Sequence, residues 1–370
     1  MTEPMNRILI KPEWTISEDD NSVQQQMPVL LRLLTAIYEL GSLSKACQAA
    51  GVSYRYAWGL IRDGSRIFGV PLVNLTRGKG AALTTLGEKL VWADRRISAR
   101  LAPILDSLAA ELAAELERVR ADAQPVLRIH ASHGYAIAVL RDLLVARGVP
   151  VELHFRASVD AFASMDQGKC EMAGFHVSIG ALQASTLAPF MRLFKPRTHT
   201  LISLITRRQG LMVASGNPMS IRAITDLARP GVRFVNRQHG SGTRRLLDVL
   251  LANEQVDSHL ISGYEIAEFT HDAVAAYIAS GMADAGFGVE PGARKFRLDF
   301  VPLVNERYFL ACRTSALATE PVKEVLAVLR GNEFRAMIND QRGLDSGDAG
   351  RTLSIEEAFP GLSDSTQAVA

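Results

Sequence analysis

Two glycines divide a helical pattern near the N-terminus into short pieces, and no other feature of the sequence constrains the fold more. Apolar residues recur at intervals of three and four over Val29–Leu40, which predicts a first helix. Gly41 interrupts the pattern, and a short second helix is expected over Leu43–Ala50. Gly51 ends that helix, and Ser53 can cap a third. Three helices with a tight glycine turn before the last one predict a helix-turn-helix.

The segment after the third helix is expected to form a hairpin. That helix should run to about Phe68, and Pro71–Leu83 then alternates apolar and polar residues around Gly78, Lys79 and Gly80. Such alternation about a glycine-containing turn is typical of two antiparallel strands. The helix-turn-helix is therefore predicted to be winged.

A long helix should follow over Thr84–Arg120, where Pro103 is the one proline. Its apolar stripe extends from Leu86 to Val119, further than a small winged domain can cover. We expect the surplus to pack on a second copy of the chain and form a homodimer. Packing against the C-terminal half is the alternative.

Beyond residues 121–125, which look like a linker, strand-like and helical segments alternate. A chain of 370 residues has room for several domains, and this alternation favours doubly wound parallel sheets in two lobes. The expected domains are 1–83 for the winged helix-turn-helix, 84–120 for the dimerisation helix and 121–370 for the two-lobed α/β part. The expected strands are Val126–Ala131, Val151–Phe155, Met172–Val177, Leu201–Thr206, Val232–Asn236, Ala283–Phe287 and Phe300–Leu303.

Charge is concentrated in one place. The net charge is only +2, yet between residues 51 and 80 five basic residues face the single acid Asp63. A basic cluster in a nearly neutral chain indicates a polyanion partner, with a solvated surface as the alternative. No apolar run is long enough to cross a bilayer and no leader pattern is present, so the cytoplasm is expected. Three widely spaced cysteines suggest neither disulfides nor zinc.

The N-terminal part resembles the winged helix-turn-helix of ModE-type and LysR-type transcriptional regulators over about residues 7–120. The resemblance rests on GSLSKACQAA, GVSYRYAWGLI and GVPLVNLTRGKGAALTTLG, which begin at Gly41, Gly51 and Gly69. It implies a dimer that binds a double-stranded DNA operator, with the third helix in the major groove. Authentic ModE also carries C-terminal oxyanion-binding modules that this chain lacks, so sensing is expected in the remaining part.

A helix in the major groove can pair guanidinium groups with guanine edges and hydroxyl groups with phosphates. We therefore expect Arg55 to contact bases, and Ser44, Lys45 and Ser53 to position phosphates. Trp58, Ile61 and Phe68 are expected to belong to the core, as is Cys47. The full set of candidate DNA-binding residues is Ser44, Lys45, Ser53, Tyr54, Arg55, Tyr56, Arg62, Arg77 and Lys79.

The segment Val126–Phe309 is similar to the PBP-like domain of periplasmic-binding-protein type, which also occurs in molybdenum-cofactor proteins. Its strongest stretches are Gly231–Leu251, Phe269–Gly288 and Met172–Ser178. The similarity implies two lobes hinged about a ligand cleft. The crossovers between lobes would lie at Asn217-Pro218 and between Gly288 and Val301.

The run Gly240-Ser241-Gly242-Thr243 lies between an expected strand and an expected helix, which predicts an anion cradle. Glycine allows close approach of the backbone, and the helix N-terminus offers free N–H groups and a positive dipole end. A simple serine-capped turn is the alternative. Other candidates follow strand ends, and the full set is Ser132, His133, Ser158, His176, Arg237, Gly240, Ser241, Gly242, Thr243, Arg244, Thr270 and His271.

Hydroxyl groups, imidazoles and backbone donors suit a small oxyanion. Molybdate or tungstate is expected from the two resemblances; formate, another small carboxylate or sulfate stays open. No Walker loop or zinc-protease pair is present, and Gln238 replaces the first glycine of a hydrolase elbow, so no enzyme, cofactor or metal is expected. An anion-binding module without a regulatory role is the other open interpretation, but it leaves the basic head unexplained.

Overall fold

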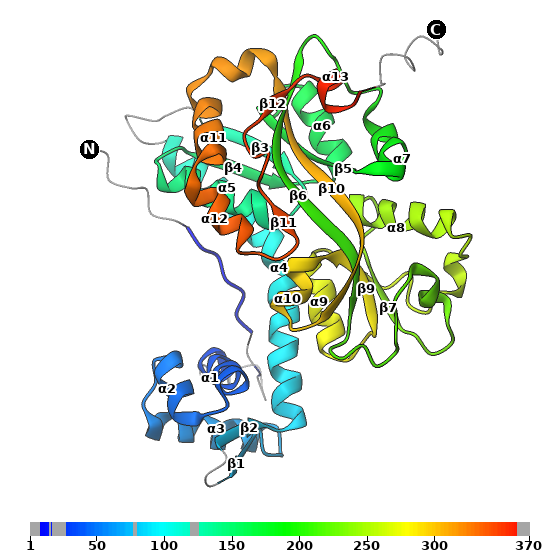
Figure 1. Ribbon diagram of the computed structural model, residues 1–370. Helices are drawn as coiled ribbons and strands as arrows, with labels where there is room; N and C mark the ends of the chain where they lie inside the picture. The colour runs from blue at the N-terminus through cyan, green and yellow to red at the C-terminus, as the bar shows by residue number, and fades with distance from the viewer. Residues whose placement is uncertain (1–7, 15, 17–26, 77–79, 119–125, 361–370) are drawn as a thin grey trace. The chain divides into compact units, whose positions relative to one another are not determined.

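The computed structural model of the 370-residue chain describes residues 8–14, 16, 27–76, 80–118 and 126–360 (Figure 1). Two compact units are present: Lys11–Leu101, the helix-turn-helix unit, and Ala102–Ala370 with Met1–Ile10, the two-lobed unit. The division lies inside one long helix. None of the helices in the described ranges is long and apolar enough to cross a membrane.

The helix-turn-helix unit contains the three predicted helices, α1 (Met27–Leu40), α2 (Leu43–Ala50) and α3 (Tyr54–Ile67). Gly51 adopts the left-handed conformation with φ 68° after α2. The Ser53 hydroxyl accepts a hydrogen bond from Tyr56 N at 3.2 Å and so caps α3. These local signals explain why the helices begin and end where the sequence predicts.

The wing consists of β1 (Val73–Thr76) and β2 (Gly80–Leu83), which pair antiparallel as predicted. Ala81 N donates to Gly41 O at 3.0 Å and joins the hairpin to the turn before α2. Arg77, Gly78 and Lys79 lie outside the described residues.

One core expectation is wrong. Ile61 and Cys47 are buried, and Phe68 is half-buried against the same core, but Trp58 is 44% exposed. The buried face of α3 consists of Ala57, Leu60, Ile61 and Gly64. Trp58 lies on the other side of the helix, so the apolar character of its ring did not indicate its position.

Two glycines of α3 predict opposite effects of the same substitution. A Cβ on Gly64 would lie 2.6 Å from Leu30 Cδ2 and 3.0 Å from Leu72 Cδ1, whereas Gly59 has open space. We expect Gly64→Ala to destabilise the unit by about 1–3 kcal/mol through overpacking. Gly59→Ala should stabilise it by about 0.5–1 kcal/mol. Urea unfolding followed by tryptophan fluorescence measures both, because all three tryptophans (Trp14, Trp58 and Trp92) lie in this unit. Equal shifts for the two variants would contradict this packing.

The long helix is α4 (Thr85–Arg118), with Pro103 inside it. The apolar residues of this helix differ in burial between its two halves. Leu90 is buried in the core of the helix-turn-helix unit, while Ile104, Leu108, Leu112 and Leu116 are exposed. The predicted surplus of apolar side chains on this helix is therefore present, confined to its C-terminal half.

The two-lobed unit is built on one ten-stranded mixed sheet in which β11 and β12 pair with β6 beside the main path. The order of that path is β4 (Val151–Phe155), β3 (Leu127–Ala131), β5 (Met172–Ser178), β10 (Asp299–Arg313), β6 (His199–Val213), β9 (Ala285–Val289), β7 (Phe234–Arg237) and β8 (Ala267–Glu268). The side strands are β11 (Leu344–Asp345) and β12 (Thr352–Leu353).

The expectation of purely parallel sheets is half right. β3 runs parallel to β4 and β5, and β7 runs parallel to β8 and β9. The 15-residue strands β6 and β10 are antiparallel to each other and extend from one lobe to the other (Figure 1). The chain therefore passes from the first lobe to the second within β6, before Asn217, and returns within β10, after Val301. Both crossovers lie in one antiparallel ladder, so they differ from the positions that the sequence predicted.

Helices cover each lobe and enclose separate cores. Buried residues such as Ile129, Phe162 and Leu310 belong to the first lobe, and Leu211, Phe234 and Leu247 to the second. The helices are α5 (Tyr135–Ala146), α6 (Ser158–Asp166), α7 (Gln183–Leu187), α8 (Gly242–Asn253), α9 (His271–Ala279), α10 (Glu290–Lys295), α11 (Glu320–Arg330), α12 (Asn332–Asn339) and α13 (Ile355–Ala358). Strand ends from both lobes therefore meet at one edge, where a cavity opens.

Candidate functional site

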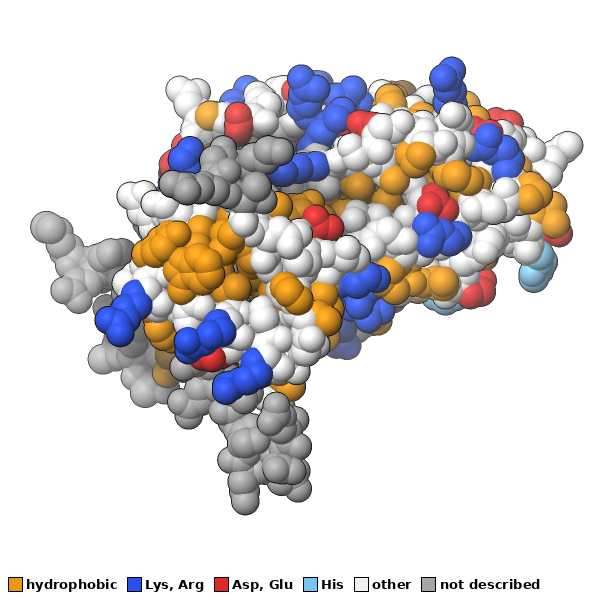
Figure 2. Space-filling view, turned by 90° about the horizontal axis from the view of Figure 1, so that it is seen from below, with side chains coloured by type: hydrophobic (Ala, Val, Ile, Leu, Met, Phe, Trp, Pro, Cys, Tyr) orange, Lys and Arg blue, Asp and Glu red, His pale blue; other side chains and the backbone are white. Residues whose placement is uncertain are grey.

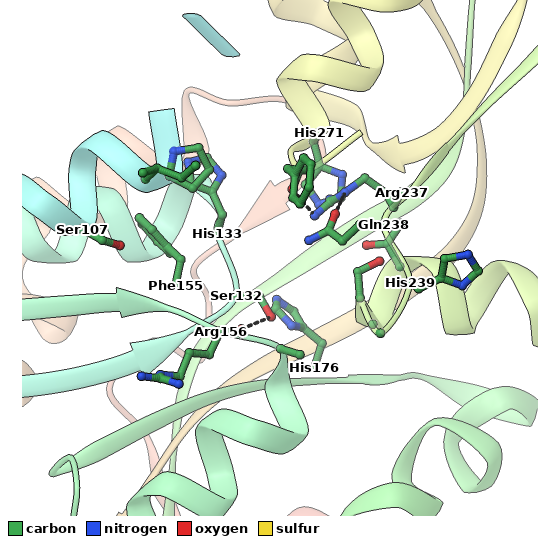
Figure 3. A pocket seen from close by; sticks show the side chains of 18 of the residues that line it. Ser107, Ser132, His133, Phe155, Arg156, His176, Arg237, Gln238, His239 and His271 are labelled. Atoms are coloured by element: carbon green, nitrogen blue, oxygen red, sulfur yellow. Dashed lines mark hydrogen bonds between the residues drawn. The ribbon is translucent and has the colours of Figure 1, made fainter. Parts of the chain in front are cut away.

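A cavity of about 440 Å³ lies between the two lobes, at the ends of their strands (Figure 3). Loops after β3, β4 and β7 contribute to its wall, and so does the C-terminal half of α4. The lining includes Ile104, Ser107, Leu108, Ser132, His133, Phe155, Arg156, His176, Arg207, Arg237, Gln238, His239, Gly240, Ser241, Gly242, Thr243, Phe269 and His271. This position, outside the ends of strands in an open α/β sheet, is where ligands bind in such folds.

The N-terminus of α8 forms one wall of the cavity. Gly240 adopts φ 78°, which turns the chain into the helix, and Ser241 caps it by accepting a hydrogen bond from Arg244 N at 3.1 Å. Helix geometry leaves the N–H groups of the first turn, at Gly242 and Thr243, without an acceptor inside the helix. The wall therefore presents backbone donors and the positive end of a helix dipole.

Arg237 supplies a buried positive charge beside this helix end. Its side chain is 5% exposed, and its Nη2 donates to the Phe269 carbonyl at 2.8 Å. No carboxylate forms an ion pair with it in the part of the chain that the structure describes. Burial, and then repulsion from Arg207, lowers the pKa of Arg237 to about 9, which still leaves it protonated at neutral pH. An uncompensated buried cation of this kind is stabilised by an anion.

Arg207 is a different case, because its charge is balanced within the protein. Arg207 Nη2 lies 2.8 Å from Glu306 Oε2, and Arg207 Nε donates to the same oxygen at 2.9 Å. Gln209 Nε2 donates to that carboxylate at 2.5 Å. This buried cluster joins β6 to β10 where the strands pass between the lobes. Of the two buried arginines in the wall, Arg237 is therefore the one that no carboxylate among the described residues balances.

Three histidines of the cavity are held neutral by burial. Burial lowers the pKa of His133 to about 4, and lowers those of His176 and His271 well below the usual 6.5, with help from nearby arginines. His176 Nε2 and His271 Nδ1 have no hydrogen-bond partner among the described residues. Figure 3 shows His176 beside Ser132, across the cavity from Arg237 and His271. Neutral imidazoles can donate a hydrogen bond to an anion.

These depressed pKa values predict that acid destabilises the two-lobed unit. In the unfolded chain histidine binds a proton below about pH 6.5, whereas in the folded protein His133 does so only near pH 4. The unfolded state therefore binds more protons between these values, and stability falls by about 1.4 kcal/mol per pH unit for each such histidine. Scanning calorimetry between pH 7 and 5, on wild type and His176→Gln, measures the slope. An unchanged slope in the variant would contradict a buried neutral His176.

Most of the predicted ligand-binding residues come together in this cavity: Ser132, His133, His176, Arg237, Gly240, Ser241, Gly242, Thr243 and His271. Ser158 lies next to it, with its hydroxyl 3.0 Å from that of Ser132. Ser158 lines a second chamber of about 290 Å³, which shares His176 and Gly242 with the first.

Two predicted residues, Arg244 and Thr270, line neither chamber. The Arg244 guanidinium packs 4.0 Å from the Tyr264 ring centre, and it donates to the Tyr264 carbonyl and to Glu265. The Thr270 hydroxyl caps α9 by accepting from Ala273 N at 2.9 Å. The use of these side chains within the protein decided both cases, because Arg244 contacts Tyr264 and Glu265 and Thr270 caps a helix.

The sequence interpretation missed Arg207, Phe155, Phe269 and the α4 residues of the wall. Arg207 carried a signal, since it is a charged residue at the end of the apolar run Leu201–Thr206. No sequence signal indicated that Ile104 and Leu108 line the cavity, because the predicted dimer interface already accounted for their apolar spacing.

A second candidate site is the exposed surface of α2 and α3. All the predicted DNA-binding residues that the structure describes are exposed: Ser44, Lys45, Ser53, Tyr54, Arg55, Tyr56 and Arg62. Arg77 and Lys79 lie outside the described residues. Figure 2 shows Lys and Arg side chains around a hydrophobic patch on the face seen from below.

Comparison with protein families finds two matches. Residues 142–330 match the PBP superfamily domain, and residues 29–88 match the bacterial regulatory helix-turn-helix protein, lysR family. The first match spans just over half of the chain. Together the matches cover both units, and they coincide with the helix-turn-helix and the two-lobed architecture described above.

Several curated relatives and solved structures are similar. The uncharacterized protein YvgK of Bacillus subtilis is 31% identical over 201 residues, 54% of this chain and 64% of YvgK, so the match leaves over a third of that relative uncovered. The molybdenum-pterin-binding protein MopB of Rhodobacter capsulatus is 38% identical over 79 residues, 20% of this chain and 29% of MopB. An OxyR variant of Corynebacterium glutamicum aligns over 84% of this chain and 92% of its own, with 12% identity and a TM-score of 0.43.

Proposed function

We propose, from the premise that this chain belongs to the PBP superfamily and carries a lysR-family helix-turn-helix ahead of that domain, that it is a one-component transcriptional regulator. It binds an operator in double-stranded DNA and senses a small anion in the cleft of the two-lobed unit, in the cytoplasm and without catalysis. The observation that carries this proposal is Arg237, a buried cation without a carboxylate partner among the described residues, beside the free N–H groups of α8.

Molybdate or tungstate is our first choice of anion. The cavity offers hydroxyl, imidazole and backbone donors, together with the buried Arg237 and the exposed Arg156, which suits an oxyanion held without its water. The relative MopB, whose name describes molybdenum-pterin binding, supports the choice. Sulfate and formate share the chemistry and are the comparison ligands.

The apolar rim favours a second candidate, the same regulator sensing a larger carboxylate. Ile104, Leu108, Phe155 and Phe269 line the same cavity as Arg237. A bare oxyanion has no apolar surface to place against them, whereas an organic carboxylate does. Relative affinities for molybdate and for a carboxylate with an apolar body, such as benzoate, separate the two candidates.

Ligand binding is coupled to DNA binding through closure of the lobes. Donors come from both sides of the cleft, with Ser132 and His176 in the first lobe and Arg237 and Thr243 in the second. An anion that contacts both sides stabilises the closed arrangement, because its contacts are complete only there. The exposed Leu112 and Leu116 of α4 are available for a second copy of the chain, and in such a dimer closure would change the spacing of the two heads.

Isothermal titration of the full chain with molybdate, tungstate, sulfate, formate and benzoate tests the sensor. We expect Thr243→Ala to weaken binding of the preferred anion about tenfold, since it removes one hydroxyl donor. Thr198→Ala, an exposed threonine outside the cavity, is the matched control. Heat from none of the anions, benzoate included, or equal affinities for Thr243→Ala and wild type, would contradict the proposed site.

DNA binding separates a regulator from an anion-binding module without a regulatory role. Arg55→Ala should weaken binding to a selected operator and change its base preference. Fluorescence anisotropy at several salt concentrations measures this. Absence of salt-dependent binding by the wild-type chain would favour the module.

A further inference from the structure

An aromatic pair is exposed on the outer face of α3. Tyr54 and Trp58 are 54% and 44% exposed, and their ring centres lie 6.4 Å apart in an edge contact. They are one helical turn apart, and Arg62 follows at the same spacing, so the three share a face. That face lies opposite the buried Leu60 and Gly64.

The surroundings of this pair carry positive charge. Arg55 and Arg62 are exposed on the same helix, and Lys45 is exposed on α2. The acid of α3, Asp63, lies 3.5 Å from Arg62 and 3.8 Å from Arg66, so its charge is already balanced. An apolar patch edged by cations matches a DNA groove, where phosphates flank the edges of the bases.

The major groove offers a specific partner to an apolar side chain. Among the four bases only thymine presents a methyl group there, and apolar contact with that methyl discriminates thymine from cytosine and from uracil. An arginine on the same helix can read guanine in the same groove. A helix with both kinds of side chain can therefore read two kinds of base.

We propose that Tyr54 and Trp58 read thymine methyl groups in the operator, beside the base contacts of Arg55. This inference rests on the proposed DNA-binding function and adds the chemical feature that the recognition helix selects. It also assigns a role to the side chain of Trp58, which is exposed and does not belong to the core.

Deoxyuridine tests the proposal, since it differs from thymidine only by lacking the methyl group. The full chain is first used to select binding sites from a random duplex library. Each selected thymine is then replaced by deoxyuridine, and affinity is measured by fluorescence anisotropy at fixed salt. We expect a loss of about tenfold at one or two positions in each half-site.

Variants assign the methyl contact to the aromatic pair. Trp58→Ala should bind the thymine operator about tenfold less tightly and should no longer distinguish thymine from uracil at one position. Tyr56→Ala is the matched control, because Tyr56 is also exposed but lies two residues from Tyr54, on another side of the helix. Whatever overall affinity it loses, Tyr56→Ala should show the same uracil penalty as wild type at the position that Trp58→Ala no longer distinguishes. Fluorescence of the remaining tryptophans and circular dichroism check that each variant is folded.

Three results overturn the proposal: selected sites without thymine, equal affinity of wild type for thymine and uracil duplexes, or the same uracil penalty in Trp58→Ala as in wild type. A failure of the proposed DNA-binding function gives a different result. In that case the wild-type chain binds no duplex in a salt-dependent manner, and the proposals of DNA binding and of thymine recognition are both wrong.

Discussion

Replacing Arg237 with methionine is expected to remove anion binding and, at the same time, to stabilise the protein without ligand. The guanidinium is buried and donates to the Phe269 carbonyl, but it has no carboxylate partner among the described residues, so no ion pair offsets its desolvation cost. Methionine fills similar space without the charge, and the free energy of unfolding should rise by about 1–4 kcal/mol. Loss of the charged donor should weaken anion binding at least a hundredfold.

Thermal melting with and without molybdate measures both effects at once. Wild type should melt higher with saturating anion, while Arg237→Met should melt at one temperature under both conditions. Arg233→Gln is the matched control, because Arg233 pairs with Asp284 in the same lobe and does not line the cavity. A variant at position 237 that is less stable without ligand and still binds anion would show that Arg237 is a structural residue.

The second large effect is expected at Glu306. Glu306→Ala leaves Arg207 buried without its counterion where β6 and β10 pass between the lobes. We expect a loss of about 3–5 kcal/mol, the usual cost of breaking a buried pair by removing one partner. The double variant Arg207→Met with Glu306→Leu should recover most of that loss, because no unpaired charge is left.

Urea unfolding followed by far-ultraviolet circular dichroism measures the two variants. Glu320→Ala is the control, since Glu320 also pairs with a basic residue, Lys323, but both side chains are exposed, 80% and 53%. It should cost less than about 1 kcal/mol. A double variant no more stable than Glu306→Ala would contradict the account of Arg207 as a charge that needs its counterion.

Local signals made the N-terminal helices predictable. Glycines ended α1 and α2, serines capped α2 and α3, and the spacing of apolar residues marked the buried faces. The run from Gly240 to Thr243 was predictable for the same reason, because a glycine turn followed by a serine cap is written in four adjacent residues. Most cavity residues followed from one rule, that ligands bind at strand ends.

Features that depend on contacts between distant residues were not predictable. The directions of β6 and β10 depend on pairing between residues about 100 positions apart, and strand-like runs do not carry that information. The exposure of Trp58 depended on which side of α3 faces the core, where its size and apolarity were misleading. The α4 wall of the cavity depends on how the part of α4 after Leu101 packs within the two-lobed unit, which the leucine stripe alone does not specify.

The most direct measurement is the affinity of the full chain for a selected operator with and without saturating molybdate, at constant ionic strength. For a regulator that senses this anion we predict a change of at least fivefold in wild type, in either direction, and no change in Arg237→Met. An anion that binds wild type in calorimetry and yet leaves its operator affinity unchanged would contradict the coupling of the cleft to DNA.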